Sequence, residues 1–494
     1  MEWPKGIKPR PYQVEAAEAL VAALEGGDIS LLSAPTGWGK TLVTLVSLKA
    51  ARMLPATWLV RSLSLASRIE EDAALLGLRT FTLLGREKCC PLYERLGEDV
   101  YDYCRYYRHR CRYFLSVDPE KALQAVDWRE LLGWGMCPYF GGELAASRAD
   151  VTVQSYWRRR RITKAIVVDE AHNLLQPREI SYPLSKLPDV LRELKKLGAS
   201  FHLVEKLERL AELDDGPIDV KLLLSEEVLE ELAELYLTAI REGRKVGLGR
   251  FLRVVGTDAQ YIESGKLMGL KASPLKLQRP AVLLSATMPE LGRRLLGVEV
   301  EVKVPMTKRI AYVLPWLTTK YDEFYENVKE YRNLLTVLKL AGKVVVFGSH
   351  RVISVLRRKA DLFEEDLVEP PRDWRGVLML KARGRFSEGV NLEAPVVAIL
   401  GCPFLPPGAA SRLARAYRRM GVENYWEMAR DVPMLITTLQ CIGRATRTPG
   451  SNPLILLADY RFKRYEKQLE EYLELNEIRS LEDVRKEINK LSSN

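Results

Sequence analysis

Long apolar runs are absent from this sequence of 494 residues. No stretch approaches the roughly 18 consecutive apolar residues that a membrane-spanning helix needs. The opening residues, MEWPKGIKPRPYQ, lack the apolar stretch of a secretory signal. CxxC pairs are also absent among the 7 cysteines, and structural zinc sites favour such close pairs, so the spacing disfavours zinc. We therefore expect a cytoplasmic protein with no membrane partner.

Composition limits the remaining possibilities. The chain has 47% hydrophobic and 28% charged residues, which is ordinary for globular proteins, and its length predicts about two to four domains. The net charge of +10 makes a polyanion a plausible partner, although many soluble enzymes are equally basic. Asn and Gln are scarce, which hints at a source that lives at high temperature, where intracellular disulfides are common.

Short β-branched apolar runs, each ending in polar residues, occur in two groups. Separated by segments of helical period, they predict buried parallel strands, and open α/β sheets bind ligands at the carboxyl ends of such strands. We therefore expect an α/β fold with two doubly wound parallel-sheet lobes. The runs are ISLLSAPTGWGKT, ATWLVRSLS, KAIVVDEAHN and AVLLSATMP in the first half, and GKVVVFGSHR, GVLMLKARGRFSEG, PVVAILGCPF and PLILLADYRF in the second.

Two stretches that lack this pattern of apolar runs interrupt the first lobe. Residues 175–272 carry Leu and Val at helical spacing among charges, which predicts a helical insertion because the strand AVLLSAT resumes afterwards. A cysteine-rich stretch forms the other insertion, and the Glu-, Lys- and Leu-rich tail from Phe462 is predicted to be helical. The predicted boundaries are 1–84, 141–174 and 273–302 for the first lobe, 85–140 for the cysteine-rich insertion, 175–272 for the helical insertion and 303–494 for the second lobe.

The segment SAPTGWGKT lies between an apolar strand and a helical segment. A glycine-rich turn there lets backbone N–H groups surround phosphates at a helix N-terminus. Lys40 would neutralise the terminal phosphates and Thr41 would reach Mg²⁺, although Ala34 stands where the general motif has Gly. The residues expected to hold ATP in this loop are Pro35, Thr36, Gly37, Trp38, Gly39, Lys40 and Thr41.

The segment AIVVDEAHN supplies the carboxylates that phosphoryl transfer needs. Asp169, at a strand end, can hold Mg²⁺ through its water shell, and Glu170 can orient the attacking water. A DE pair alone is usually a solvated strand end, but its combination with Lys40 predicts a nucleoside triphosphatase.

The order of the motifs resembles that of a superfamily 2 helicase. The sequence is most similar to the xeroderma pigmentosum group D (XPD) helicase family, in a compact archaeal-type form. The similarity spans nearly the whole chain and is weakest over residues 175–272. It implies two RecA-like lobes, an iron–sulfur insertion and a helical arch. The segments that carry it are RPYQ, SAPTGWGKT, VRSLS, CPYFGGELAASRADVTVQSYW, DEAH, LLSATMPE, GRFSEGVNL, QCIGRATRTP and LADYRF.

The resemblance assigns roles to further residues. Arg61 and Ser62 would grip the nucleic-acid backbone, although Leu65 stands near where the family often has Gln. In the segment GRFSEGVNL, which matches the family's coupling motif, Asn391 stands where the family usually has Asp. Arg444 lies three residues before Arg447 on one expected helix face and could stabilise the transferring phosphate. Gly384, Ser387, Glu388 and Gly389 match the coupling motif in GRFSEGVNL. The nucleotide-binding residues outside the glycine loop would be Arg10 and Gln13 in RPYQ, which matches the adenine motif, together with His172, Glu388, Gly389, Gln440, Arg444 and Arg447.

The clustered cysteines admit a disulfide, a metal site or chance clustering of buried side chains. The candidates are Cys89 or Cys90, then Cys104, Cys111 and Cys137. An iron–sulfur cluster tolerates their wide spacing, and the XPD family carries one at the matching place. The resemblance thus implies a 4Fe–4S cluster.

Cys90 is favoured over Cys89 as the first ligand, because the family commonly has an Arg four positions earlier, as Arg86 is here. The alternatives of Cys89 and of disulfides stay open. Cys402 and Cys441 read as buried small side chains.

Two segments mix aromatic and basic residues. YDYCRYYRHRCRYF offers rings for base stacking and cations for phosphates, or its Tyr residues simply cover the cluster. WRRRR, at 157–161, predicts phosphate contacts or a solvated turn.

The leading hypothesis is a monomeric ATP-dependent helicase acting on single-stranded and forked DNA. The resemblance implies 5′ to 3′ movement, a role in DNA repair and repair-protein partners. The alternatives are an ATP-switched damage-recognition or scaffold protein and a redox-responsive DNA-binding module.

Overall fold

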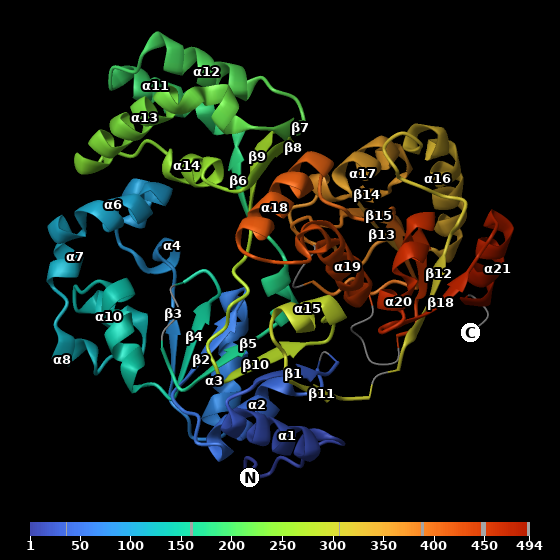
Figure 1. Ribbon diagram of the computed structural model, residues 1–494, viewed down its shortest axis with the longest axis horizontal. Helices are drawn as coiled ribbons and strands as arrows, with labels where there is room; N and C mark the ends of the chain where they lie inside the picture. Colours follow the sequence, from blue (N-terminus) through green and yellow to red (C-terminus); the bar gives the residue numbers. More distant parts are fainter. Residues whose placement is uncertain (36, 159–161, 306, 387–389, 446–450, 492–494) are drawn as a thin grey trace. The chain divides into compact units, whose positions relative to one another are not determined.

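The computed structural model describes residues 1–494 except 36, 159–161, 306, 387–389, 446–450 and 492–494 (Figure 1). The chain divides into two compact units. The first contains Met1–Ala286, Arg293–Val304 and Gly408–Glu423, and the second contains Thr287–Gly292, Pro305–Pro407 and Asn424–Asn494. Within the described ranges, no helix combines the length and the apolar character needed to cross a membrane.

A seven-stranded parallel sheet forms the base of the first unit. Its strands β1, β2, β5 and β10 are the four predicted from their apolar runs, and each side chain in β2, β5 and β10 is buried. Strands in their order across the sheet are β11 (Val300–Lys303), β1 (Ile29–Ser33), β10 (Ala281–Ser285), β5 (Ala165–Val168), β2 (Ala56–Val60), β4 (Val151–Ser155) and β3 (Thr80–Leu83). The accompanying helices are α1 (Gln13–Gly26), α2 (Lys40–Ala50), α3 (Ala66–Ala74) and α15 (Glu290–Leu295).

The parallel arrangement brings the ends of distant segments to one edge of the sheet. Strand β1 ends at Ser33 before the glycine loop, and β5 ends at Val168 before Asp169. Strand β10 pairs with both and ends at Ser285. Because carboxyl ends of parallel strands share an edge, the glycine loop and Asp169 are neighbours across one strand.

The cysteine-rich insertion runs between β3 and β4 and consists of short helices. These are α4 (Arg86–Cys89), α5 (Tyr93–Leu96), α6 (Val100–Tyr107), α7 (Arg112–Leu115), α8 (Pro119–Ala122), α9 (Trp128–Gly133) and α10 (Pro138–Ala145).

The insertion between β5 and β10 is only partly helical, which corrects the prediction for residues 175–272. It contains a four-stranded sheet in which β6, β9, β8 and β7 pair antiparallel. Strands β8 and β9 form a hairpin whose two loop residues, Ser264 and Gly265, both have positive φ. Such a two-residue Ser-Gly loop favours a hairpin, whereas the helical spacing of Leu and Val led to the prediction of a helical insertion. The elements are β6 (Arg178–Pro183), α11 (Leu187–Lys196), α12 (Phe201–Ala211), β7 (Gly216–Ile218), α13 (Val220–Arg241), α14 (Gly249–Val255), β8 (Ala259–Glu263) and β9 (Lys266–Lys271).

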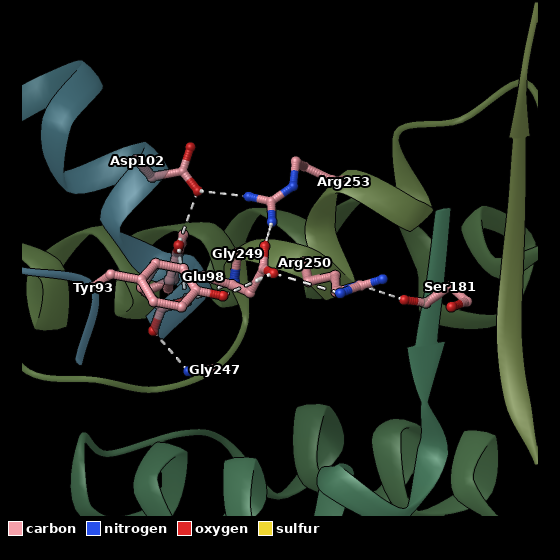
Figure 2. Close-up of polar contacts among 10 residues, drawn as sticks. Tyr93, Glu98, Asp102, Ser181, Gly247, Gly249, Arg250 and Arg253 are labelled. Atoms are coloured by element: carbon pink, nitrogen blue, oxygen red, sulfur yellow. Dashed lines mark hydrogen bonds and ion pairs between the residues drawn. The ribbon is translucent and has the colours of Figure 1, made fainter. Parts of the chain in front are cut away.

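The two insertions share one hydrophobic core. Leu96 and Val100 of the cysteine-rich insertion are buried in the same cluster as Phe251 of the second insertion. Figure 2 shows the polar contacts at this junction, where Glu98 forms ion pairs with Arg250 at 3.4 Å and Arg253 at 2.5 Å. The insertions are therefore joined by apolar packing and by charge. The four-part domain division stays a prediction.

A second seven-stranded parallel sheet forms the other unit and contains the four predicted strands β13, β15, β16 and β17. Across the sheet the order is β14 (Leu362–Phe363), β15 (Gly376–Lys381), β13 (Lys343–Gly348), β16 (Val396–Leu400), β17 (Leu454–Ala458), β12 (Arg309–Val313) and β18 (Leu473–Glu477). Its helices are α16 (Phe324–Leu338), α17 (His350–Leu356), α19 (Tyr425–Ala445), α20 (Glu466–Leu469) and α21 (Leu481–Leu491).

Strand β18 corrects the prediction of a wholly helical tail from Phe462. It pairs with β12 at the edge of the sheet, with Leu473 buried and most of its polar residues exposed. An edge strand with one covered face tolerates this polar composition, which resembles that of a surface helix.

Helix α18 (Pro407–Arg419) is encoded between strands of the second sheet, yet Gly408–Glu423 packs within the first unit. Arg412 donates to the carbonyl of Gln260 in β8, and the fully buried Tyr417 hydroxyl accepts from the Ser273 amide at 3.5 Å. These contacts tie α18 to the second insertion.

Candidate functional site

The glycine loop after β1 depends on two left-handed backbone positions. Gly37 has φ +80° and Gly39 has φ +103°. A Cβ at residue 39 would lie 2.6 Å from Gln13 Nε2, so only glycine leaves room for that side chain. Helix α2 then begins at Lys40 and aims its N-terminus at the loop, with Thr41 in its first turn. Pro35 lies in the loop, and Thr36 lies outside the described residues.

Arg10 and Gln13, predicted to form the adenine motif, brace this loop from outside. The Arg10 guanidinium donates to the Gly37 carbonyl at 2.9 Å, and Gln13 Nε2 donates to the Trp38 carbonyl at 2.7 Å. The Arg10 amide in turn donates to Gln13 Oε1 at 2.8 Å. The structure thus brings both residues to the predicted nucleotide loop.

Lys40 lies inside the loop, with its Nζ 2.9 Å from the Ala34 carbonyl and 3.1 Å from the Pro35 carbonyl. Burial lowers its pKa, while the nearby carboxylates of Glu170 and Asp169 act in the opposite direction. The cation and the two carboxylates therefore occupy one electrostatic environment, as the motifs predicted.

Asp169 and Glu170 follow β5 at the same edge. Burial, and after it the charge of Glu170, raises the pKa of Asp169 to about 6. The Glu170 amide donates to Asp169 Oδ1 at 2.9 Å, and Glu170 itself adopts the left-handed conformation with φ 49°. Such a backbone is uncommon for a residue with a side chain, and it persists only where neighbouring groups hold it.

His172 connects this carboxylate pair to the end of β10. Its Nε2 lies 3.3 Å from Glu170 Oε2, and its Nδ1 lies 2.8 Å from Ser285 Oγ. Burial lowers the pKa of His172, which favours the neutral ring. In that form Nε2 donates to Glu170 and Nδ1 accepts from the Ser285 hydroxyl. Ser285 was not singled out from the sequence, although it stands in LLSATMPE.

The residues expected to grip a nucleic-acid backbone follow β2. Arg61 Nη1 donates to Asn173 Oδ1 at 2.5 Å, next to the DEAH segment. Ser62 caps the short helix after it by accepting from the Ser64 amide at 3.4 Å, and Leu65 is 39% exposed. Arg61 therefore borders the nucleotide edge of the sheet.

The predicted site residues of the second unit are partly described. Gln440 and Arg444 lie one turn apart near the end of α19, and Arg444 is buried, with its carbonyl accepting from the Leu392 amide at 3.1 Å. A Cβ at Gly384 would lie 2.3 Å from the Glu364 carboxylate, which explains the glycine there. The other predicted residues of this unit, Ser387, Glu388, Gly389 and Arg447, lie outside the described residues. The roles of Gln440 and Arg444 stay predictions.

Four thiols of the cysteine-rich insertion influence one another. Burial raises the pKa of Cys90 to about 11, with further contributions from Cys137, Cys104 and Cys111. Burial also raises the pKa of Cys137, and Cys104 and Cys111 add to this effect. All seven cysteines of the chain are free thiols. The four predicted ligands therefore lie within electrostatic range of one another.

Cys89 lies differently from Cys90. Its Sγ contacts the Leu84 carbonyl at 3.9 Å, and burial raises its pKa to about 12. Of the distant cysteines, Cys137 also acts on Cys89, whereas Cys137, Cys104 and Cys111 all act on Cys90, which favours Cys90 as the fourth member of the set.

The iron–sulfur cluster stays a prediction for the four thiols. Among the described residues, no three His, Cys, Asp or Glu side chains lie close enough to share one metal ion. A tetrahedral zinc holds its sulfurs about 4 Å apart, given its short bonds.

Arg86 is stacked against Tyr139, with 3.8 Å between the guanidinium and the ring centroid. Burial acts to lower the pKa of Arg86, but hydrogen-bonded Cys104 and Tyr139 raise it overall. This cation therefore lies beside the thiols, where it can offset the charge of a thiolate set.

The basic and aromatic segments have mixed roles. Tyr103 is 9% exposed in the shared core, whereas Tyr106 is 47% exposed and remains available for stacking. Arg158 of WRRRR does not face solvent, because its side chain donates to Glu143 at 2.7 Å and to the Leu84 carbonyl at 2.5 Å. The predicted phosphate contact is therefore wrong for Arg158, and residues 159–161 lie outside the described range.

Comparisons with known proteins agree with this geometry. Residues 327–476 match the model of the helicase C-terminal domain family. The chain is 26% identical over 541 residues to the ATP-dependent DNA helicase XPD of Sulfolobus acidocaldarius, covering 92% of this chain and 97% of that protein. A solved XPD helicase structure has a TM-score of 0.70 at 21% identity, covering 96% of this chain and all of the other. The structure of Xpd4 from S. tokodaii has a TM-score of 0.60 at 19% identity, covering 94% of this chain and all of the other. The chain is thus similar to XPD helicases over nearly its whole length, in sequence and in fold.

Proposed function

We propose that this protein is an ATP-dependent DNA helicase that moves 5′ to 3′ along single-stranded DNA and unwinds forked duplexes during DNA repair. The observation that carries the proposal is the meeting of Lys40 with Asp169 and Glu170 at one sheet edge. The similarity to a DNA helicase, of which the alignment covers 97%, supports DNA as the substrate. The net charge of +10 suits a polyanion.

In this proposal each residue has a separate task in ATP hydrolysis. The loop amides and Lys40 bind the phosphates, and Thr41 and Asp169 would hold Mg²⁺, which neutralises phosphate charge when bound. Glu170 orients the attacking water, with His172 fixing its carboxylate at 3.3 Å. Arg10 and Gln13 keep the loop in shape for the base and phosphates. Gln440, Arg444 and Arg447 complete the ATP interface in the proposal.

The cysteine-rich insertion would hold a 4Fe–4S cluster. The ligands would be Cys90, Cys104, Cys111 and Cys137, the set whose thiols influence one another. A bound cluster would supply a rigid cross-link between the segments that carry the four cysteines. Exposed Tyr106, with the Arg105 guanidinium 5.4 Å from its ring centroid, offers a base-stacking surface nearby.

The decisive experiment uses forked duplexes with a 5′ or a 3′ single-stranded tail, incubated with ATP and the protein as purified. We expect unwinding only with the 5′ tail, and loss of unwinding in the variants Lys40→Ala and Glu170→Gln. Arg148→Ala, at an exposed site in the cysteine-rich insertion, is the control and should unwind normally. Unwinding by either active-site variant would contradict the proposal.

The same assay separates the alternative function. If the wild-type protein hydrolyses ATP and binds the fork but leaves it paired, an ATP-switched damage-recognition or scaffold protein is the better description. A redox-responsive DNA-binding module would instead show ATP-independent DNA affinity that changes on oxidation of the cluster. The proposed monomeric state, cytoplasmic location and repair-protein partners need sedimentation, fractionation and co-purification.

A further inference from the structure

Tyr156, near the end of the segment CPYFGGELAASRADVTVQSYW, contacts the backbone of Asp169 and Glu170. It follows β4, and its hydroxyl donates to the carbonyls of Asp169 and Glu170, the latter at 3.2 Å. The side chain is 7% exposed, so the hydroxyl has little access to water. Both carbonyls that flank the left-handed position of Glu170 are thus held by one group.

This hydrogen bonding bears on the orientation of Glu170. With this backbone at φ 49°, the Glu170 carboxylate lies 3.3 Å from His172 Nε2. An uncommon conformation reverts unless its surroundings fix it. Tyr156 holds the carbonyls of Asp169 and Glu170, on either side of the Glu170 Cα, and so supports the backbone that carries the Glu170 carboxylate.

Tyr156 is itself anchored from two directions. Its amide donates to the Val60 carbonyl at 3.1 Å, which ties it to the end of β2. Two residues later, Arg158 donates to the Leu84 carbonyl and, at 3.0 Å, to the Tyr139 carbonyl. Leu84 and Tyr139 lie at the two ends of the cysteine-rich insertion, so one short segment contacts both that insertion and the DEAH backbone.

We infer that Tyr156 is a positioning residue for ATP hydrolysis, acting through Glu170, and that Arg158 anchors it to the base of the cysteine-rich insertion. The inference rests on the proposed function, since it assumes hydrolysis at Lys40, Asp169 and Glu170. It gives Tyr156 a role in hydrolysis that the sequence alone did not assign to it.

The test compares Tyr156→Phe with Tyr331→Phe in steady-state ATP hydrolysis by the full chain with saturating single-stranded DNA. Tyr331 is a matched control, because it is a buried tyrosine whose hydroxyl donates to a backbone carbonyl, that of Ala458, at 2.7 Å. We expect Tyr156→Phe to lower kcat roughly 10- to 100-fold, the range that small misplacements of catalytic groups produce. KM for ATP should stay within about twofold, because phosphate binding does not depend on Glu170. Tyr331→Phe should keep the wild-type kcat.

A double variant separates positioning from general damage. In the Glu170→Gln background, Tyr156→Phe should cause no further loss of kcat, since the group it positions has been removed. Equal kcat for the two Tyr→Phe variants, or full additivity with Glu170→Gln, would overturn the inference. If Lys40→Ala still hydrolysed ATP at the wild-type rate, the proposed function itself would fail, which is a distinct outcome.

Discussion

The Asp99 carboxylate accepts a hydrogen bond from the Gly249 amide at 2.9 Å, across 150 residues of sequence. The same carboxylate accepts from the amides of Val246 at 2.8 Å and Gly247 at 2.7 Å, and from the Tyr236 hydroxyl at 3.2 Å. Asp99 is fully buried. Burial and the carboxylates of Asp99 and Asp102 raise the pKa of Tyr236, so its hydroxyl remains a donor. One buried carboxylate therefore joins the cysteine-rich insertion to the second insertion.

Replacing Asp99 by Ala should destabilise the first unit. Three buried amides would lose their acceptor, and the expected loss is on the order of 3 kcal/mol at about 1 kcal/mol or more for each amide. Calorimetry should show a lower melting temperature, and hydrogen exchange should quicken at residues 246–249. Asp189→Ala removes an exposed carboxylate of the second insertion and should change neither measurement appreciably. Unchanged exchange in the Asp99 variant would contradict this account.

The adjacent cysteines should respond differently to substitution. Cys90→Ser removes a member of the four-thiol set, so protein purified without oxygen should lose its brown colour and most of its iron. Cys89→Ser alters a side chain that contacts the Leu84 carbonyl and should keep both. Visible absorbance and iron per protein are the measurements. The assignment would have to be reversed if the serine at 89 bleached the protein and the serine at 90 did not.

Gln13→Ala should weaken ATP binding with little loss of turnover. Its amide holds the Trp38 carbonyl at 2.7 Å, so its removal frees the glycine loop without touching Lys40 or Glu170. We expect KM to rise about tenfold with kcat nearly unchanged, the pattern of lost uniform binding. The exposed Gln124, changed to Ala, is the control. A selective fall in kcat would instead place Gln13 in the chemical step.

Arg158→Ala should loosen the cysteine-rich insertion. The substitution removes the guanidinium that donates to the Leu84 and Tyr139 carbonyls and that pairs with Glu143 at 2.7 Å. Iron should then be released to a chelator about tenfold faster, as for other losses of groups that orient metal ligands. The exposed Arg148, changed to Ala, should release iron at the wild-type rate. Equal rates for both variants would show that Arg158 does not support the cluster.

Local patterns were sufficient for the strands and motifs. The apolar runs that became β1, β5 and β10, and the glycines at positions 37 and 39, carry their signal within a few residues. Patterns of mixed polarity were less informative. The segments of the β8–β9 hairpin and β18 were predicted to be helical. In short charged segments, the alternation of apolar and polar residues that is typical of a strand is hard to distinguish from the spacing that is typical of a helix.

The sequence by itself determined two α/β lobes, a phosphate loop ending in Lys40 and a carboxylate pair at a strand end. These follow from near-neighbour rules of strand period, turn geometry and helix start. Only the tertiary structure decided which distant groups meet: Asp99 with Gly249, α18 with the second insertion, and Tyr156 with the carbonyls of Asp169 and Glu170. Such pairings depend on how buried polar groups find partners after the chain has folded, and no short stretch of sequence encodes that choice.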